Sequence, residues 1–224
     1  MSDFSDDLRD FRAMKGPVIE GGEASLEAVD RLRETTPEGY ADFISEHGFD
    51  QYLGGYCQLC DPTALQPVVD GLFKRETDIR PDETVAIAYS AMGHLILWNV
   101  QHRAVIVDFN WLHVSCPSLL RPKPEIAPSI TFTTTLFFLD GQNYAGVDEN
   151  GKDLFPQIKA IHGIPSYGQI FAPRLHPALG GYRRADNYRP VAASTAFSLM
   201  LSAGPFILMD NKPFPPKPVR EIGG

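Results

Sequence analysis

The sequence predicts an α+β protein, because helical and strand-like patterns fall in separate stretches of the chain. Apolar residues recur at helical spacing within residues 25–48. From residue 84, three runs rich in Val, Ile, Leu and aromatic residues are separated by turn residues, as in an antiparallel meander. A proline-rich stretch at 117–128 precedes further segments of both kinds. We therefore expect N-terminal helices with an antiparallel sheet, then a second, smaller α+β domain.

Two helices are predicted in the first fifty residues. Ser25 can cap the first of them. The apolar positions of this helix recur at a spacing of three: Leu26, Val29 and Leu32. Pro37 suits the first turn of the second helix, which ends near His47-Gly48. The apolar stripe of the second helix consists of Tyr40, Phe43 and Ile44.

A third helix and the meander follow. Asp61-Pro62 predicts the helix start, because an aspartate caps well and a proline fits the first turn. The strands of the meander are expected at Thr84–Tyr89, His94–Asn99 and Ala104–Asp108, with a further short strand from Trp111 to Val114.

The four prolines within residues 117–128 predict a stiff linker between two domains, at 15–116 and 129–212. The elements expected in the second domain are a strand from Ile130 to Leu139, a helix from Leu154 to His162, irregular chain from Ser166 to Gly181 and a helix from Asp186 to about Ser202.

Composition is that of an ordinary globular protein, with 43% hydrophobic and 21% charged residues among 224. No apolar stretch approaches the roughly 18 residues of a membrane span, and the N-terminus lacks the basic start and apolar run of a secretory signal. Three cysteines fit a reducing compartment better than a disulfide framework. We expect a cytoplasmic protein.

Charge is distributed unevenly along the chain. Residues 1–50 carry 13 acidic and 5 basic side chains, a net −8, whereas residues 51–224 carry 15 of each. A negative field of this kind repels nucleic acid and attracts a basic partner, although carboxylates also simply decorate solvent-exposed helix faces. The candidate partner-binding residues on the two N-terminal helices are Glu23, Glu27, Asp30, Glu34, Glu38, Asp42 and Glu46.

Two Cys and His pairs have the spacing of zinc ligands. Cys57 and Cys60 are separated by two residues, as are His113 and Cys116, so the four side chains can in principle form a Cys3His site. The alternative is that they are small buried residues of strand-like segments. A zinc-dependent enzyme using these four residues is one of the functional hypotheses.

Other catalytic signatures are missing from the sequence. There is no HExxH, GxSxG, GxGxxG or Walker-type motif, so we expect no enzymatic activity and no cofactor. A basic and aromatic cluster can bind RNA or phosphate, form the rim of a protein interface, or pair with the acidic helices. Its members are Arg174, Tyr182, Arg183, Arg184, Tyr188 and Arg189.

Both halves resemble known domains. The first half resembles the GAD-like domain in the order of four segments: Glu38 to Ile44, Gly54-Gly55-Tyr56, Asp61-Pro62 and Ala88 to Asn99. The second half resembles the domain of unknown function that typically follows it, through Ser166 to Pro173 and Pro177 to Gly181. The pair is similar to immunity proteins of bacterial type VI secretion systems, which protect the producing cell from its own DNase effector.

This resemblance implies a non-enzymatic inhibitor that covers the active site or the DNA-binding surface of a cognate DNase toxin, encoded by the adjacent gene. It implies no direct contact with nucleic acid or membrane. A DNase presents Lys and Arg to phosphates, so carboxylates on the inhibitor complement it. Candidate aromatic anchors for such an interface are Tyr40, Tyr52, Tyr56 and Trp111. The alternative is an adaptor or regulatory binding module without a toxin partner.

Overall fold

The computed structural model describes residues 4–140 and 146–223, and it confirms the α+β class. A nine-stranded sheet in the order β1-β2-β3-β4-β5-β6-β7-β10-β11 forms the centre, and β8 pairs with β9 apart from it. All pairs are antiparallel except β7 with β10. The strands are β1 Gly21–Gly22, β2 Phe49–Tyr52, β3 Cys57–Leu59, β4 Thr84–Ser90, β5 His94–Asn99, β6 Arg103–Asp108, β7 His113–Ser115, β8 Gln169–Pro173, β9 Tyr188–Ala192, β10 Phe206–Asp210 and β11 Lys217–Ile222.

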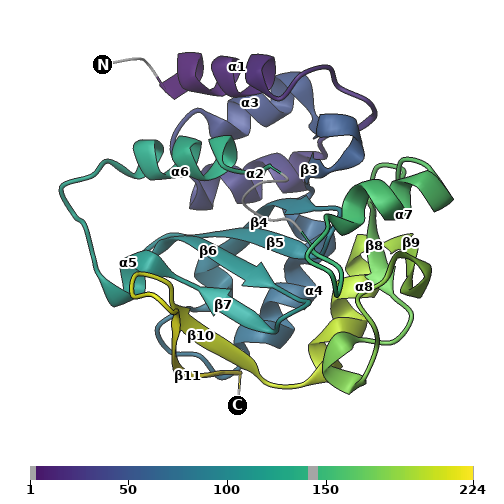
Figure 1. Cartoon of the computed structure of the whole chain (residues 1–224). Coiled ribbons are helices and arrows are strands. Elements are labelled where there is room, and N and C mark those ends of the chain that lie inside the picture. Colours follow the sequence, from purple (N-terminus) through teal and green to yellow (C-terminus); the bar gives the residue numbers. More distant parts are fainter. Residues whose placement is uncertain (1–3, 141–145, 224) are drawn as a thin grey trace.

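Helices cover both faces of the large sheet. The α-helices are α1 Phe4–Met14, α2 Leu26–Thr35, α3 Tyr40–His47, α4 Pro62–Phe73, α5 Pro117–Leu120, α6 Pro128–Phe137, α7 Leu154–His162 and α8 Ala193–Met200. Short 3-10 helices are η1 Leu53–Gly55, η2 Pro81–Glu83, η3 Pro177–Leu179, η4 Ala185–Asn187 and η5 Leu201–Ala203. Figure 1 shows α1, α3 and α6 above the sheet.

Two apolar cores result, one on each sheet face. The upper core packs α1, α2, α3, α6 and α7 on the sheet, and the lower core packs α4 and α8 on the opposite face. Neighbouring residues of β4 alternate between them: Val85 and Ile87 lie in the upper core, whereas Ala86 lies in the lower core. Because both faces are dry, β4 and β5 are buried along their whole length.

Most predicted elements of the first half are present. The meander strands are β4, β5 and β6, and the further short strand is β7. The Ser25 side chain caps α2 by accepting from the Ala28 N–H, and Asp61 caps α4 by accepting from the Thr63 N–H. Leu26 differs from the prediction, since its side chain is 84% exposed and Ala28 joins Val29 in the core instead.

The predicted strand from Ile130 to Leu139 is wrong, because this segment forms helix α6. Pro128 occupies its first turn, and the buried residues Phe132, Thr133 and Leu136 share one helical face. The threonines suggest a strand. In α6, however, the Thr135 hydroxyl donates a hydrogen bond to the backbone carbonyl of Thr131, which the helical geometry places one turn earlier. Packing of Phe132 against aromatic rings of the upper core outweighs the local strand preference.

Two predictions in the last third also need correction. The expected helix from Asp186 to about Ser202 is split into strand β9 and helix α8, and the expected irregular stretch contains strand β8. Pro190 lies within β9, an edge strand of the two-stranded sheet that β9 forms with β8, so its missing N–H is tolerated there. The predicted helix α7 is present, with Gly163 at its C-cap.

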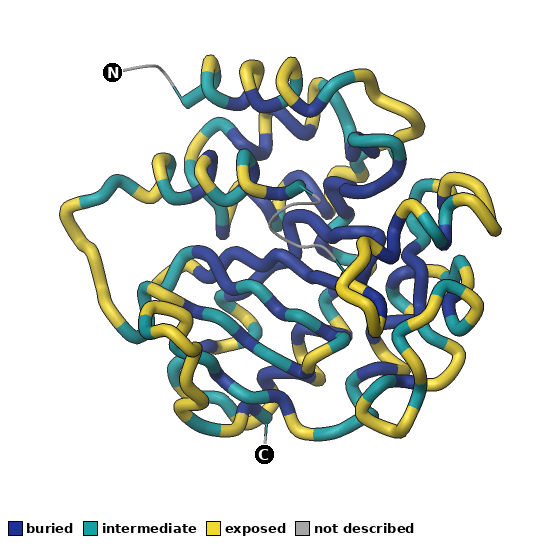
Figure 2. The backbone as a smooth tube through the Cα atoms, in the orientation of Figure 1, coloured by how far each residue is buried: buried dark blue, intermediate teal, exposed yellow. Residues whose placement is uncertain are grey.

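The proline-rich stretch 117–128 contains helix α5 and an exposed loop that leads to α6 (Figure 2). Strands from beyond this stretch extend the sheet of the first half, since Leu208 of β10 pairs with Val114 of β7. The division into domains 15–116 and 129–212 stays a prediction about independent folding.

Candidate functional site

The predicted acidic residues gather on helices α2 and α3 and the turns beside them. Glu27, Asp30 and Glu34 follow one another at spacings of three and four along α2, so they share one face of that helix. Asp42 and Glu46 lie one turn apart on α3. All seven side chains of the acidic face are exposed: Glu23, Glu27, Asp30, Glu34, Glu38, Asp42 and Glu46.

Core packing explains why these carboxylates point outward. Val29 and Leu32 of α2, with Tyr40 and Ile44 of α3, are buried in the upper core. The apolar stripe of each helix therefore faces the sheet, and the polar stripe faces solvent. The two helices also pack on each other, which places their outer faces on one surface.

The acidic face is only partly neutralised by neighbouring cations. The Arg33 guanidinium lies 2.9 Å from the Asp30 carboxylate and 3.4 Å from that of Asp42, and so links α2 to α3. Within residues 4–140 and 146–223, the carboxylates of Glu27 and Glu34 accept no hydrogen bond and form no ion pair. Exposed and uncompensated carboxylates leave a negative surface that a cationic partner can meet.

The structure separates the candidate aromatic anchors. Tyr40, Tyr52 and Tyr56 are buried side chains of the upper core and cannot contact a partner. Trp111 is 54% exposed, and the Arg183 guanidinium lies over its ring at 4.3 Å from the centroid. This is a cation–π contact on the surface.

The basic and aromatic cluster predicted at residues 174–189 is also divided. Tyr188 is buried, whereas Tyr182 is 67% exposed beside Arg183 in the chain. Arg184 pairs with Asp186 at 3.3 Å. None of the cluster's arginines forms an ion pair with a described carboxylate of residues 4–50, so the alternative in which the cluster pairs with the acidic helices is not observed.

The Cys3His arrangement does not form. Cys57 lies in the upper core, whereas Cys60 and Cys116 lie in the lower core on the other sheet face. Burial raises the pKa of the Cys57 thiol to about 12 and that of Cys116 to about 11, so both stay protonated. Among the described residues, no three His, Cys, Asp or Glu side chains are placed to hold a metal ion.

A Ser, His and Asp array that sequence motifs did not reveal joins β4, β5 and β6. The Ser90 Oγ lies 3.1 Å from His94 Nδ1, and His94 Nε2 lies 3.2 Å from Asp108 Oδ2. Strand register explains the second contact, because His94 pairs directly with Asp108 across β5 and β6. This pairing could have been predicted from the sequence by counting residues outward from the turn between the two expected strands.

The geometry of this array indicates a structural role. Ser90 has no exposed surface, and its oxygen accepts from the backbone N–H groups of Met92 and His94, which fixes the β4–β5 turn. Burial raises the pKa of Asp108, but the hydrogen bond and charge of His94, with the N–H groups of Trp111 and Asn110, outweigh it and lower the pKa. A nucleophile needs access to its substrate, which Ser90 lacks.

Comparison with known proteins supports the resemblance of the first half. Residues 8–110 match the GAD-like domain, so the chain carries a GAD-like domain. The crystal structure of Atu4351 from Agrobacterium tumefaciens is similar over 93% of this chain and 95% of that chain, with 29% sequence identity and a TM-score of 0.88. No curated protein matches the sequence. In the described part of the chain, no helix has the length and apolar character needed to cross a membrane.

Proposed function

We propose that this protein is a cytoplasmic immunity protein that binds and inhibits a cognate type VI secretion DNase toxin. The observation that carries the proposal is the acidic face of α2 and α3, where seven exposed carboxylates lie within a GAD-like domain. The toxin is expected to be the product of the adjacent gene.

The inhibitory mechanism is electrostatic complementarity followed by steric occlusion. A DNase needs Lys and Arg side chains at its DNA groove to contact phosphates. The acidic face offers carboxylates to the same side chains, and so speeds association and blocks the groove or the active site. The same negative field repels DNA, so the protein itself has no direct nucleic-acid contact. No catalytic step and no cofactor is required.

An adaptor or regulatory module is the second candidate function. It is favoured by the exposed Trp111, with Arg183 over its ring and Tyr182 exposed nearby in the chain. Trp, Arg and Tyr are the residue types enriched at energetically dominant positions of protein interfaces. These residues lie outside the acidic face, so they can serve a partner other than a toxin.

Co-purification with the product of the adjacent gene tests the proposal. We expect a stable complex that survives gel filtration, and loss of DNA cleavage when the product is assayed with one equivalent of this protein. The absence of a nuclease gene next door, or a nuclease that neither binds nor loses activity, would favour the adaptor function instead.

A further inference from the structure

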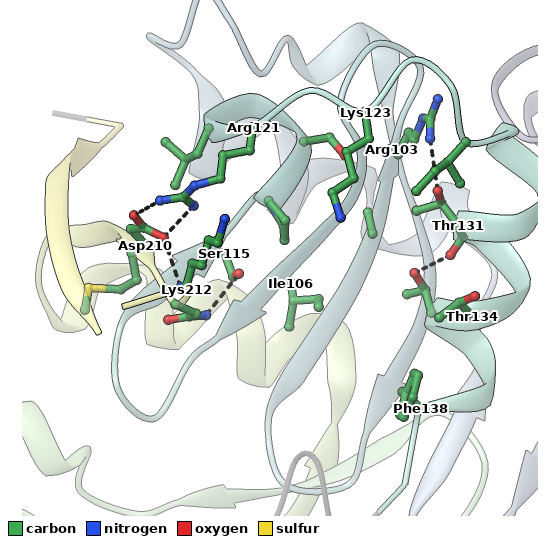
Figure 3. A pocket seen from close by; sticks show the side chains of 18 of the residues that line it. Arg103, Ile106, Ser115, Arg121, Lys123, Thr131, Thr134, Phe138, Asp210 and Lys212 are labelled. Carbon is green, nitrogen blue, oxygen red and sulfur yellow. Dashed lines mark hydrogen bonds and ion pairs between the residues drawn. The ribbon is translucent and has the colours of Figure 1, made fainter. Parts of the chain in front are cut away.

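A cavity of about 800 Å³ opens between α6 and the sheet (Figure 3). Its walls come from β6, β7, the 117–128 stretch, α6 and the segment from Met209 to Lys212. The upper face of the sheet is buried where α1, α2 and α3 cover it. Ile106 and Ser115 lie on the same face but are only half-buried. This volume lies within the roughly 300–1,000 Å³ of typical small-molecule sites.

The interior of the cavity is largely apolar. Ile106 projects from β6, and the facing wall is lined by Ile130 of α6 and by Phe138, the C-cap residue of α6. Ile130 and Phe138 are 48% and 55% exposed, which is a large exposed fraction for apolar residues. A ligand with an apolar body would remove this surface from water, which is favourable in proportion to the area covered.

The charges around the cavity are mostly positive. Its lining contains four cations, Arg103, Arg121, Lys123 and Lys212, and one carboxylate, Asp210. In a chain of net charge −8, this local excess of cations is opposite in sign to the whole molecule.

Two of these cations are already engaged, and two are not. Arg121 forms a two-pronged ion pair with Asp210, and this contact, together with the backbone N–H and the charge of Lys212, lowers the pKa of Asp210 to about 2. Arg103 donates to the Thr131 hydroxyl at 3.1 Å. Among residues 4–140 and 146–223, the ammonium groups of Lys123 and Lys212 make no hydrogen bond or ion pair, and both point into the cavity.

We propose that this cavity binds a small amphipathic anion, a carboxylate or phosphate carried on an apolar body. Lys123 and Lys212 pair with the anionic group, and Ile106, Ile130 and Phe138 cover the body. Two lysines that form no ion pair with a described carboxylate, at the edge of an apolar chamber, match such a ligand in both charge and polarity. The cavity lining shares no residue with the acidic face, so the proposed ligand binding can be tested independently of the proposed toxin binding.

Calorimetric titration of the full chain with decanoate and with decyl phosphate tests the site. Decyltrimethylammonium keeps the alkyl chain but reverses the charge, and inorganic phosphate keeps the charge but lacks the chain. We expect saturable one-to-one binding of decanoate or decyl phosphate, and no saturable binding of either control compound. Preference for one of the two anions identifies the headgroup.

Variants test the charged contacts and the space inside the cavity separately. Lys123→Gln with Lys212→Gln should weaken anion binding about tenfold or more, because two charged contacts are removed. Thr134→Trp places an indole in the cavity from α6 and should abolish binding. Lys74→Gln, an exposed lysine outside the cavity, is the matched control and should bind as the parent does. Melting temperatures check that each variant is folded.

Several results would overturn the proposal. These are no saturable binding of either anion, equal binding of the cationic surfactant, binding of phosphate alone, or unchanged affinity in the double lysine variant. Binding confined to vesicles that contain phosphatidylglycerol, with none to monomeric decanoate or decyl phosphate, would indicate a membrane surface and would also overturn it.

Discussion

The acidic face and the cavity beneath α6 are opposite in charge and in shape. The acidic face is an exposed helical surface with seven carboxylates, whereas the cavity has an apolar interior with four cations in its lining. An exposed helical surface suits a macromolecule that brings its own complementary face, and a chamber suits a small molecule. One chain of net charge −8 therefore presents two surfaces suited to different partners.

Helix α6 contributes both to the upper core, on which α2 and α3 pack, and to the wall of the cavity. Phe132 and Leu136 are buried in the upper core with α2 and α3, whereas Ile130, Thr134 and Phe138 line the cavity. The buried face of α6 thus supports the packing of α2 and α3, and its other face forms a wall of the cavity. Substitutions on the two faces of α6 should separate stability from ligand binding.

Phe132→Ala should have the largest effect. The Phe132 ring lies 4.5 Å from that of Tyr40 and 5.0 Å from that of Trp98, centroid to centroid, so its removal opens a cavity in the upper core. We expect a loss of about 3–5 kcal/mol in the free energy of unfolding, measured by urea denaturation. Phe138→Ala, at the C-cap of the same helix and in the cavity lining, is the control and should cost less than about 1 kcal/mol. Equal losses would contradict the two-sided description of α6.

Charge reversal on the acidic face should have the next largest effect. Glu27→Lys, Glu34→Lys and Glu38→Lys together should lower the association rate with the toxin by about 10- to 1,000-fold at low salt, because steering is lost. Stopped-flow fluorescence measures the rate and its salt dependence, which should also weaken.

The control for charge reversal changes net charge equally elsewhere. Glu125→Lys, Glu149→Lys and Glu221→Lys alter three exposed carboxylates outside the first fifty residues. The association rate of this control should stay well above that of the acidic-face variant. If the two variants associate at the same rate, net charge rather than the acidic face governs binding.

Asp108→Asn should have a moderate, pH-dependent effect. The pKa of Asp108 is lowered in the folded state, so its contribution is complete above the unfolded value of about 4 and is lost as pH falls through the folded pKa. We expect a loss of about 1–2 kcal/mol at pH 7 that shrinks toward pH 2. Urea unfolding at several pH values measures it, with the exposed Asp70→Asn as control. A loss that is unchanged at pH 2 would show that the charge of Asp108 is not its source.

Removal of metal should have the smallest effect. The three cysteines are buried on two sides of the sheet, and no zinc site is assembled from the described residues. EDTA should shift the melting temperature by no more than about one degree, since a structural zinc would contribute to folding outright. A large destabilisation by the chelator, with zinc found in the purified protein, would restore the metal hypothesis.

Sequence patterns predicted the elements whose signals are local. Asp61-Pro62 starts a helix, and β4 and β5 follow from continuous apolar runs that both sheet faces require. Helix α6 was missed because its threonines favour strands locally, and only its packing on the upper core decides otherwise. Strand β9 was missed because Asp186 and the apolar residues after it indicated a helix, whereas the pairing with β8 is not encoded by a local pattern.

The acidic face and the cavity also differ in how far the sequence alone could predict them. The acidic residues are close together in the sequence, so their clustering was predictable from charge alone, and the structure adds only their exposure. The cavity joins residues from Arg103 to Lys212, which the fold brings together from five segments. No local pattern encodes that juxtaposition, because it depends on the long-range pairing of β7 with β10.

A DNA-cleavage assay tests the central claim most directly. The product of the adjacent gene, which is the proposed toxin, is incubated with plasmid DNA and increasing amounts of this protein, or of its triple acidic-face variant. We predict that one equivalent of the parent protein abolishes cleavage, and that the variant requires a large excess to do so. Full cleavage in the presence of several equivalents of the parent protein would contradict the immunity function.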